Sequence, residues 1–263
     1  MITSPSNPII KSVKGLHRQR GRKQARQFIV EGLRLVEEAL RAGHIPALMF
    51  YTPNLEKSAR GQNLLALARD ASLRPILVSE RIMRAAATTK TPQDVLAVVP
   101  WLSLPWPKHP DLLLILDQLR DPGNMGSVLR TAEAAGVKGV LFSPGTVDVY
   151  NPKVVRGAMG AHFRLSFRAA TWPDIEEATQ GLQTWLAEIR DGVPYYQVDW
   201  LPPSALIIGN EASGASIKAR KLAQGQTYIP MLGQAESLNA AVAAGIIIFE
   251  AIRQRALAQK QLL

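Results

Sequence analysis

The residues best suited to chemistry lie in two short loops near the C-terminus, and each loop follows an apolar stretch. The first is Gly209-Asn210-Glu211-Ala212-Ser213-Gly214, and the second contains Ser237-Leu238-Asn239. Glycines allow a ligand to approach the backbone closely, and carboxylate, hydroxyl and amide side chains can orient it. Polar loops at the carboxyl ends of buried strands are where α/β proteins bind ligands. We therefore predict that both loops belong to one active site.

A third polar cluster, Asn124 to Arg130, follows the apolar run from Asp111 to Asp117. That run predicts a strand buried on both faces, as in a parallel sheet. We expect Asn124 to cap the helix that follows, and Ser237 to cap the helix-like run from Ala240 to Gln259. The carboxyl ends of neighbouring parallel strands meet at one edge of a sheet, so all three clusters are predicted to converge on one crevice.

Other common chemistries lack their motifs. The sequence has no GxxxxGK[ST] phosphate loop, and the glycines of residues 209–214 have the wrong spacing for a dinucleotide fingerprint. Ser237 has no convincing histidine and acid partners for nucleophilic catalysis. The four histidines are scattered and cysteine is absent, so we predict no metal site and no disulfide.

The charge of the chain favours a polyanionic partner. The formal net charge is +10, and Lys and Arg that neutralise phosphates release condensed counterions. No acid precedes Glu31, and the basic residues before it are Lys11, Lys14, Arg18, Arg20, Arg22, Lys23 and Arg26. A solvated helix face or a flexible arm would also explain an isolated basic run. Together with the global charge, this run predicts a surface that binds RNA or DNA.

The remaining patterns divide the chain into two α/β regions. Alternating helix and strand patterns over residues 1–100 predict a small α/β sandwich. Four prolines between residues 100 and 110 break helices and central strands, which predicts a linker over 101–111. Its two tryptophans either pin the linker onto a domain or stack on bases. A second α/β domain is predicted over 112–263, with a helix from Pro173 to Ile189 and strands at Tyr195–Val198 and Ala205–Ile208.

The sequence gives no sign of a membrane or secretory protein. The longest apolar stretches are too short to span a bilayer. The start of the chain lacks a basic region followed by an apolar segment. With no cysteine present, a cytoplasmic location is expected.

Taken together, the three clusters resemble the motifs of the SpoU-type RNA ribose 2′-O-methyltransferases. The matching residues are Asn124-Met125-Gly126 with Arg130, then Gly209 to Gly214, then Ile229-Pro230-Met231 with Gly233 and Ser237-Leu238-Asn239, and Asp148 to Arg156 is also similar. The resemblance covers residues 112 to 259. It implies a deep trefoil-knotted α/β domain, S-adenosylmethionine as cofactor, and a homodimer. Residues 1–100 resemble the family's ribosomal-protein-like substrate-binding domain.

The same resemblance implies roles for individual residues. Backbone groups around Gly209, Ile229 and Leu238 would hold the cofactor, and the pocket would be completed by Met231, Leu232 and Gly233. The implied catalytic set is Asn124, Arg130, Glu211, Ser237 and Asn239. Family proposals assign activation of the 2′-hydroxyl to the residue matching Arg130, in cis or from the other subunit. A guanidinium stays protonated, so we expect Arg130 to clamp an RNA phosphate instead. For Glu211, anchoring the loop and contacting the substrate are both open.

We therefore predict methyl transfer from S-adenosylmethionine to a ribose 2′-hydroxyl in structured RNA. Ribosomal RNA is favoured over transfer RNA, because in the family such an N-terminal domain commonly accompanies ribosomal substrates. Three alternatives remain: methylation of transfer RNA, a non-catalytic RNA-binding or assembly protein on the same fold, and methylation of a base nitrogen. Cofactor binding and the identity of the methylated atom distinguish them.

Overall fold

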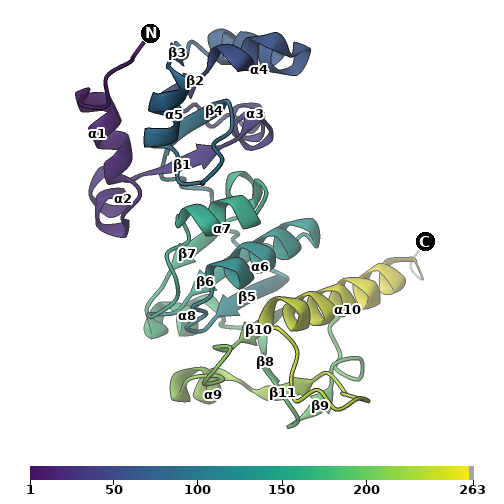
Figure 1. Ribbon diagram of the computed structural model, residues 1–263. Coiled ribbons are helices and arrows are strands. Elements are labelled where there is room, and N and C mark those ends of the chain that lie inside the picture. Colours follow the sequence, from purple (N-terminus) through teal and green to yellow (C-terminus); the bar gives the residue numbers. More distant parts are fainter. Residues whose placement is uncertain (261–263) are drawn as a thin grey trace. The chain divides into compact units, whose positions relative to one another are not determined.

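The chain folds as two compact units in a computed structural model that describes residues 1–260 (Figure 1). The first unit comprises Met1–Leu102 together with Asp148–Phe163. The second comprises Ser103–Val147 and the chain from Arg164 onwards. The segment Asp148–Phe163 interrupts the second unit in sequence and packs as part of the first.

The first unit is a four-stranded sheet with helices on it. The sheet order is β1-β4-β2-β3, in which β4 is antiparallel to β1 and β2, while β3 is parallel to β2. One apolar cluster joins α1 and α5 to the sheet through Ile10, Val13, Ile82 and Phe50. Asn7 caps α1, and its Oδ1 accepts a hydrogen bond from the N–H of Ile9 at 2.9 Å. The elements in chain order are α1 (Pro8–Gly15), α2 (Gln19–Ala25), β1 (Gln27–Glu31), α3 (Leu33–Arg41), β2 (Leu48–Tyr51), η1 (Pro53–Lys57), α4 (Ala59–Asp70), β3 (Ile76–Leu77), α5 (Glu80–Ala86), β4 (Val95–Pro100), α7 (Pro152–Gly157) and η2 (Ala161–Phe163).

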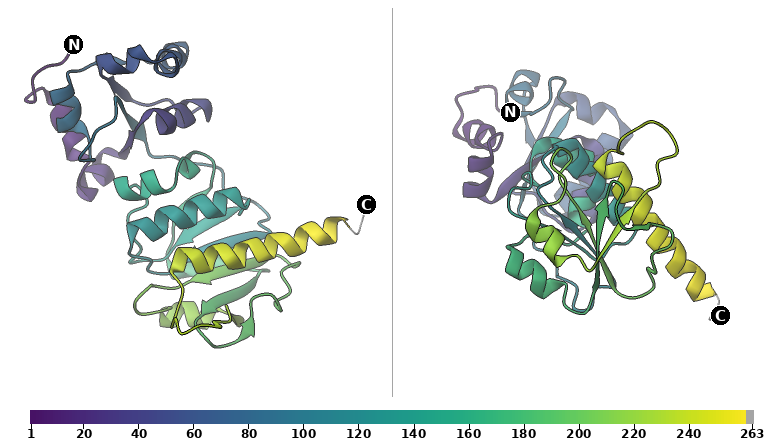
Figure 2. Two further views of the ribbon diagram at one scale, coloured as in Figure 1. Left: turned by 45° about the vertical axis from the view of Figure 1, so that its right-hand side comes forward. Right: turned by 90° about the horizontal axis from the view of Figure 1, so that it is seen from below.

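The second unit is a seven-stranded, wholly parallel sheet. Its order is β7-β6-β5-β10-β8-β11-β9. Helices α6 and α10 lie together on one face, and α8 and α9 cover the other (Figure 2). Its elements are β5 (Leu112–Leu116), α6 (Pro122–Ala134), β6 (Gly139–Phe142), β7 (Phe167–Ala169), α8 (Trp172–Ala178), β8 (Gln183–Glu188), β9 (Val193–Pro194), β10 (Ser204–Ile208), α9 (Ile217–Leu222), β11 (Gly225–Tyr228) and α10 (Ala240–Lys260).

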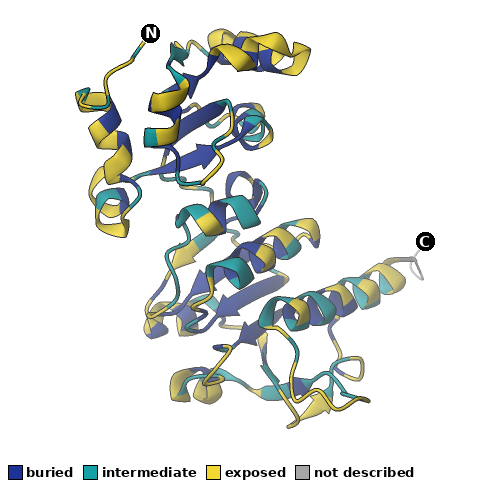
Figure 3. Ribbon diagram, viewed as in Figure 1, coloured by how far each residue is buried: buried dark blue, intermediate teal, exposed yellow. Residues whose placement is uncertain are grey.

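The two strands β5 and β10 in the middle of this sheet are formed by continuous runs of mostly apolar residues. Every residue of β5 and β10 is buried (Figure 3), as expected for strands covered by helices on both faces. They pair in register, with Leu114 opposite Leu206 and Leu116 opposite Ile208. Because the whole sheet is parallel, the loops after β5, β10, β8 and β11 all leave it at the same edge.

The helix predicted from Pro173 to Ile189 is wrong in its second half. Helix α8 ends at Ala178, and residues 183–188 form β8 between β10 and β11. Gly181 has a φ of +79°, which ends the helical path. Thr184 and Leu186 are then buried on one face of the sheet, as alternate residues of a strand are. The strand predicted at Tyr195–Val198 is also wrong, since the short strand β9 lies just before it.

Two predicted helix caps are placed differently. Asp121 caps α6, and its Oδ1 accepts from the N–H of Asn124 at 2.8 Å. Pro122 is the first helical residue, the position at which proline is preferred. Asn239 lies at the start of α10, where its Oδ1 accepts from the N–H groups of Ala241 at 2.9 Å and Val242 at 3.4 Å. Asn124 and Ser237 are therefore not caps, which leaves their side chains available for other contacts.

Each tryptophan of the proline-rich stretch packs within a different unit. Trp101 stacks on Tyr150 in the first unit, with ring centroids 5.0 Å apart, and the guanidinium of Arg26 lies 5.7 Å from its ring. Trp106 packs in the second unit on Gly139, where a Cβ would come within 2.7 Å of the indole. Within residues 1–260, no helix is both long and apolar enough to cross a membrane.

Candidate active site

A cavity of about 370 Å³ lies at the carboxyl edge of the parallel sheet. This volume is in the range of small-molecule binding sites, roughly 300–1,000 Å³. The chain contributes to it from the start of α6, the end of β8, the loops after β10 and β11, and the first turns of α10. The lining residues include Asn124, Ala187, Glu188, Ile189, Ile208, Gly209, Asn210, Glu211, Ile229, Met231, Ser237, Leu238, Asn239, Ala243 and Ile247.

A chain of hydrogen bonds joins three of the predicted catalytic residues. Asn239 Nδ2 donates to Asn124 Oδ1 at 2.7 Å, and Asn124 Nδ2 donates to Glu211 Oε1 at 2.9 Å. Glu211 also accepts from the backbone N–H groups of Arg120 and Asp121, at 3.3 Å each. The carboxylate therefore fixes the loop after β10 to the loop after β5. Of the two roles open for Glu211, loop anchoring has direct contacts.

The loop after β10 is held in shape by two further side chains. Asn210 Oδ1 accepts from the N–H groups of Ala212 and Ser213, while its Nδ2 donates to the carbonyl of Gln118 at 2.7 Å. Asp117 is fully buried at the end of β5, and its Oδ2 accepts from the N–H of Ser216 at 2.7 Å. Buried polar groups that are fully bonded rigidify the backbone around them. The cavity wall is thus preformed by its own hydrogen bonds.

Gly209 occupies a position that only glycine fits. A Cβ there would lie 2.7 Å from the nitrogen of Ala215 and 2.8 Å from the carbonyl carbon of Gly214. Both neighbours are backbone atoms, so they cannot swing away as a side chain would. Glycine at the end of β10 lets the loop turn back across the cavity mouth.

Most of the predicted cofactor-binding residues are brought together. Gly209, Ile229, Met231 and Leu238 line the cavity. Leu232 and Gly233 do not: the Leu232 side chain is fully exposed. Gly233 lines a neighbouring cavity of about 410 Å³ instead. The turn after Met231 therefore carries these two residues away from the site.

Of the predicted catalytic residues, Asn124, Glu211, Ser237 and Asn239 line the cavity, and Arg130 does not. Arg130 is exposed on α6, six residues beyond Asn124. At 1.5 Å per residue, its Cα lies about 9 Å further along the helix axis. Within one subunit, its guanidinium is not part of the cavity wall.

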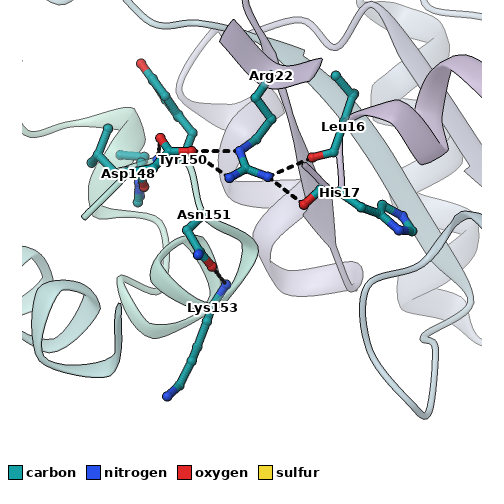
Figure 4. A network of polar contacts seen from close by, with 9 residues as sticks. Leu16, His17, Arg22, Asp148, Tyr150, Asn151 and Lys153 are labelled. Carbon is teal, nitrogen blue, oxygen red and sulfur yellow. Dashed lines mark hydrogen bonds and ion pairs between the residues drawn. The ribbon is translucent and has the colours of Figure 1, made fainter. Parts of the chain in front are cut away.

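The basic run differs from the prediction at one residue. Lys11, Lys14, Arg18, Arg20, Lys23 and Arg26 are exposed on α1, α2 and their flanks. Arg22 is only 2 % exposed. Its Nε and Nη2 donate to Asp148 Oδ2 at 2.9 and 2.6 Å, and its Nη1 donates to the carbonyls of Leu16 and His17 (Figure 4). Arg22 is therefore a structural residue of the first unit, because its guanidinium is buried and all three of its nitrogens bond within that unit.

The segment that receives Arg22 is well packed in the first unit. Tyr150 lies on Phe28 of β1 with ring centroids 4.7 Å apart, and burial raises the pKa of its hydroxyl to about 12. His162 Nε2 bonds to the carbonyl of Val149 at 2.8 Å. Burial lowers the pKa of this histidine to about 4. Tyr150 and His162 thus contribute neutral, buried groups to the core of this unit.

Sequence reasoning missed the three cavity residues Ala187, Glu188 and Ile189. Ala187 and Glu188 end β8 and Ile189 follows it; this stretch was predicted as helix, so no loop was expected there. The one sequence feature that hinted at a break in the helix was Gly181, and it did not identify the strand that follows. Across residues 1–260, no cluster of three or more His, Cys, Asp or Glu side chains has the arrangement of a metal site.

The fold and the cavity define a class of protein: a parallel α/β domain that binds a small molecule at the carboxyl edge of its sheet, joined to a smaller basic unit. Comparison with known families narrows that class. Residues 111–249 match the SpoU rRNA Methylase family, and residues 7–97 match the MRM3-like substrate binding domain. The chain belongs to the SpoU rRNA methylase family.

Similar proteins extend over nearly the whole chain. A 23S rRNA (guanosine(2553)-2'-O)-methyltransferase from Bacillus subtilis (strain 168) is 32% identical, covering 94% of this chain and 97% of the relative. A 23S rRNA (uridine(2479)-2'-O)-methyltransferase from Streptomyces viridochromogenes is also 32% identical, over 89% and 85% of the two chains. The crystal structure of an AdoMet-bound rRNA methyltransferase from Sinorhizobium meliloti superposes with a TM-score of 0.84 at 31% identity, covering 96% of this chain and 97% of that one.

Proposed function

We propose that this protein transfers a methyl group from S-adenosylmethionine to a ribose 2′-hydroxyl of ribosomal RNA. The observation that carries the proposal is the cavity at the sheet edge, where the three motif loops are tied together by the bonds Asn239–Asn124 and Asn124–Glu211. Membership of the SpoU family and relatives named as rRNA 2'-O-methyltransferases support it.

The residues of the cavity suit the cofactor. Ile208, Ile229, Leu238 and Ile247 supply apolar walls for a planar ring, while Gly209 leaves the backbone open at the mouth. When bound, S-adenosylmethionine supplies a methyl group on a positively charged sulfur. The sulfur leaves readily because it departs as a neutral thioether. The protein must then align the acceptor oxygen with that methyl and favour loss of its proton.

The Asn239–Asn124–Glu211 chain provides the groups for the acceptor side. Both asparagines have fixed orientations, because each donates its amide N–H to the next residue in the chain. A preorganised polar wall stabilises developing charge without reorienting at the moment of reaction. Ser237 lies beside this wall in the cavity lining and can donate its hydroxyl to the RNA. We assign these four residues to positioning the 2′-hydroxyl.

Arg130 is assigned to a phosphate of the RNA. A guanidinium stays charged and binds phosphate oxygens in a bidentate fork, but it is a poor base. Because Arg130 stands outside the cavity of its own subunit, we propose that it acts on RNA held at the cavity of a second subunit. Helix α10 supports a homodimer, since Val242 and Phe249, two turns apart, are each 50% exposed. We also propose that the second unit has the knotted backbone path that the family resemblance implies.

The first unit is proposed to hold the RNA. Six exposed cations on α1, α2 and their flanks form a surface suited to phosphates. The match to the MRM3-like substrate binding domain supports this role and favours ribosomal over transfer RNA. We place the enzyme in the cytoplasm, where a cysteine-free chain with a ribosomal substrate would work.

The proposal is tested by incubating the purified protein with methyl-labelled S-adenosylmethionine and unmodified ribosomal or transfer RNA. The labelled RNA is then digested with alkali, which cleaves next to every free 2′-hydroxyl. We expect label in alkali-resistant dinucleotides from ribosomal RNA alone. Label in mononucleotides would indicate base methylation, and label in transfer RNA would reassign the substrate. A protein that binds RNA but no cofactor would be an assembly factor.

A further inference from the structure

We propose that Glu188 is a cofactor-binding residue whose carboxylate accepts hydrogen bonds from the ribose hydroxyls of S-adenosylmethionine. This inference rests on the proposed function, because it names a contact within the same cavity. Glu188 is the last residue of β8, and it lines the cavity between Ala187 and Ile189.

The Glu188 carboxylate is held in place and has one oxygen to spare. Its side chain is 13% exposed, and its Oε1 forms an ion pair with Arg220 Nη1 that lacks hydrogen-bond geometry. Among residues 1–260, no group donates a hydrogen bond to its Oε2. A mostly buried carboxylate that lines a cavity and has an oxygen without a protein donor is placed to accept a hydrogen bond from a ligand.

Arg220 lies between this carboxylate and the loop after β10. It lies on α9, and its Nη2 is 3.5 Å from the position that a Cβ would take at Gly214. The Glu188–Arg220 pair therefore spans from the end of β8 to the loop after β10. Because the ion pair offsets the charge of the carboxylate, covering the free oxygen with a ligand has a smaller desolvation penalty than covering an isolated charge.

The surroundings of Glu188 match the nucleoside part of the cofactor. In the sheet, β8 is separated from β5 by β10, so Glu188 lies on the opposite side of β10 from the Asn124 loop. The reactive methyl must face the Asn124 side. Glu188 is in register with Tyr228 of β11, so Ile229 follows directly beside it, and Ile189 is its own neighbour. The apolar groups suit an adenine ring, and the carboxylate beside them suits the adjoining ribose diol. In other α/β nucleotide sites an acidic residue likewise bonds the ribose hydroxyls.

The test measures the coupling between the residue and the ligand hydroxyls. Binding of 5′-methylthioadenosine and of its 2′-deoxy and 3′-deoxy forms is measured by titration calorimetry. The proteins are the wild type, Glu188→Ala and the control Glu176→Ala, which removes an exposed acid on α8. Arg220→Ala is a second variant that keeps the carboxylate but removes its ion pair. S-adenosylmethionine binding is measured in parallel for all four proteins.

A hydrogen bond to a charged group predicts that loss of at least one hydroxyl weakens wild-type binding about tenfold or more. In Glu188→Ala that penalty should shrink to about twofold or less, because the partner is gone. Glu176→Ala and Arg220→Ala should keep the penalty. These readouts do not depend on activity, and they compare ligands on one folded protein, so a general loss of stability cannot produce them.

Three results would overturn the assignment. Glu188→Ala could discriminate the deoxy ligands as strongly as the wild type does. It could instead weaken all ligands by the same factor, which indicates a structural role, or weaken S-adenosylmethionine but not methylthioadenosine, which indicates a contact with the methionine ammonium. Failure of the wild type to bind S-adenosylmethionine at all would reject the proposed function itself.

Discussion

Replacing Arg22 should damage the fold of the first unit much more than it damages RNA binding. Arg22 and Asp148 form an ion pair in which Nε and Nη2 both donate to Asp148 Oδ2, and the two side chains are 3% and 11% exposed. Removing one partner from a buried pair leaves an uncompensated charge, which costs about 3–5 kcal/mol. Asp148 Oδ1 keeps one bond from the N–H of Tyr150 at 3.1 Å, so we expect the lower end of that range for Arg22→Ala.

The loss also has a local component. In Arg22→Ala, the carbonyls of Leu16 and His17, which follow the end of α1, both lose their hydrogen bonds from the α2 residue Arg22. The matched control is Arg20→Ala, because Arg20 is exposed on the same helix. An exposed substitution of this kind changes stability by about 0.5 kcal/mol or less, but it removes one phosphate contact and should lower the salt dependence of RNA binding.

Amide hydrogen exchange of β1 reports on the first unit alone. A loss of about 3 kcal/mol predicts that exchange limited by opening of this unit accelerates roughly hundredfold in Arg22→Ala. The second unit should keep its protection and its affinity for the cofactor. Unchanged β1 protection in Arg22→Ala, together with a loss of RNA affinity equal to that of Arg20→Ala, would refute the burial argument and restore Arg22 to the RNA surface.

Three further predictions concern other parts of the molecule. Asn239→Ala should lower stability by about 1 kcal/mol through loss of the α10 cap and also abolish most methyl transfer, whereas Ser237→Ala should leave urea unfolding unchanged. Burial lowers the pKa of His162 from 6.5 to about 4, so the unfolded chain binds more protons between those two pH values. The free energy of unfolding therefore falls as the pH drops through that window, by roughly 3 kcal/mol. In urea unfolding at pH 7 and pH 4.5, His162→Gln should show a weaker pH dependence than the wild type. Arg130→Lys should lose most activity while keeping its charge, with Arg69→Lys as an exposed control; near-normal methyl transfer by Arg130→Lys would contradict the phosphate clamp.

The strands of the sheet centre could be predicted because they depend on composition alone. β5 and β10 are short, continuous runs of mostly apolar residues, which is the pattern of strands covered on both faces. β8 could not be separated from a helix, because Thr184, Leu186 and the residues around them also fit a helical face. Its pairing with β10 and β11 decided the outcome, and pairing partners are not visible in a single sequence.

The site shows the same division between local and tertiary information. Asn124, Glu211 and Asn239 were found because glycine-rich loops follow apolar strands, and the structure joins them by hydrogen bonds. Arg22 could not be distinguished from the cations around it, because its partner Asp148 lies 126 residues away in the sequence. Leu232 sits one residue from Met231 yet faces outward, because the turn that follows β11 decides its direction.

The central claim is tested most directly by mapping ribose methylation on ribosomal RNA from cells with and without this protein. The account predicts that one 2′-O-methyl mark disappears in its absence, and that purified protein with S-adenosylmethionine restores that mark on the same RNA. An unchanged set of 2′-O-methyl marks, accompanied by the loss of a methyl group from a base or from a transfer RNA, would contradict it.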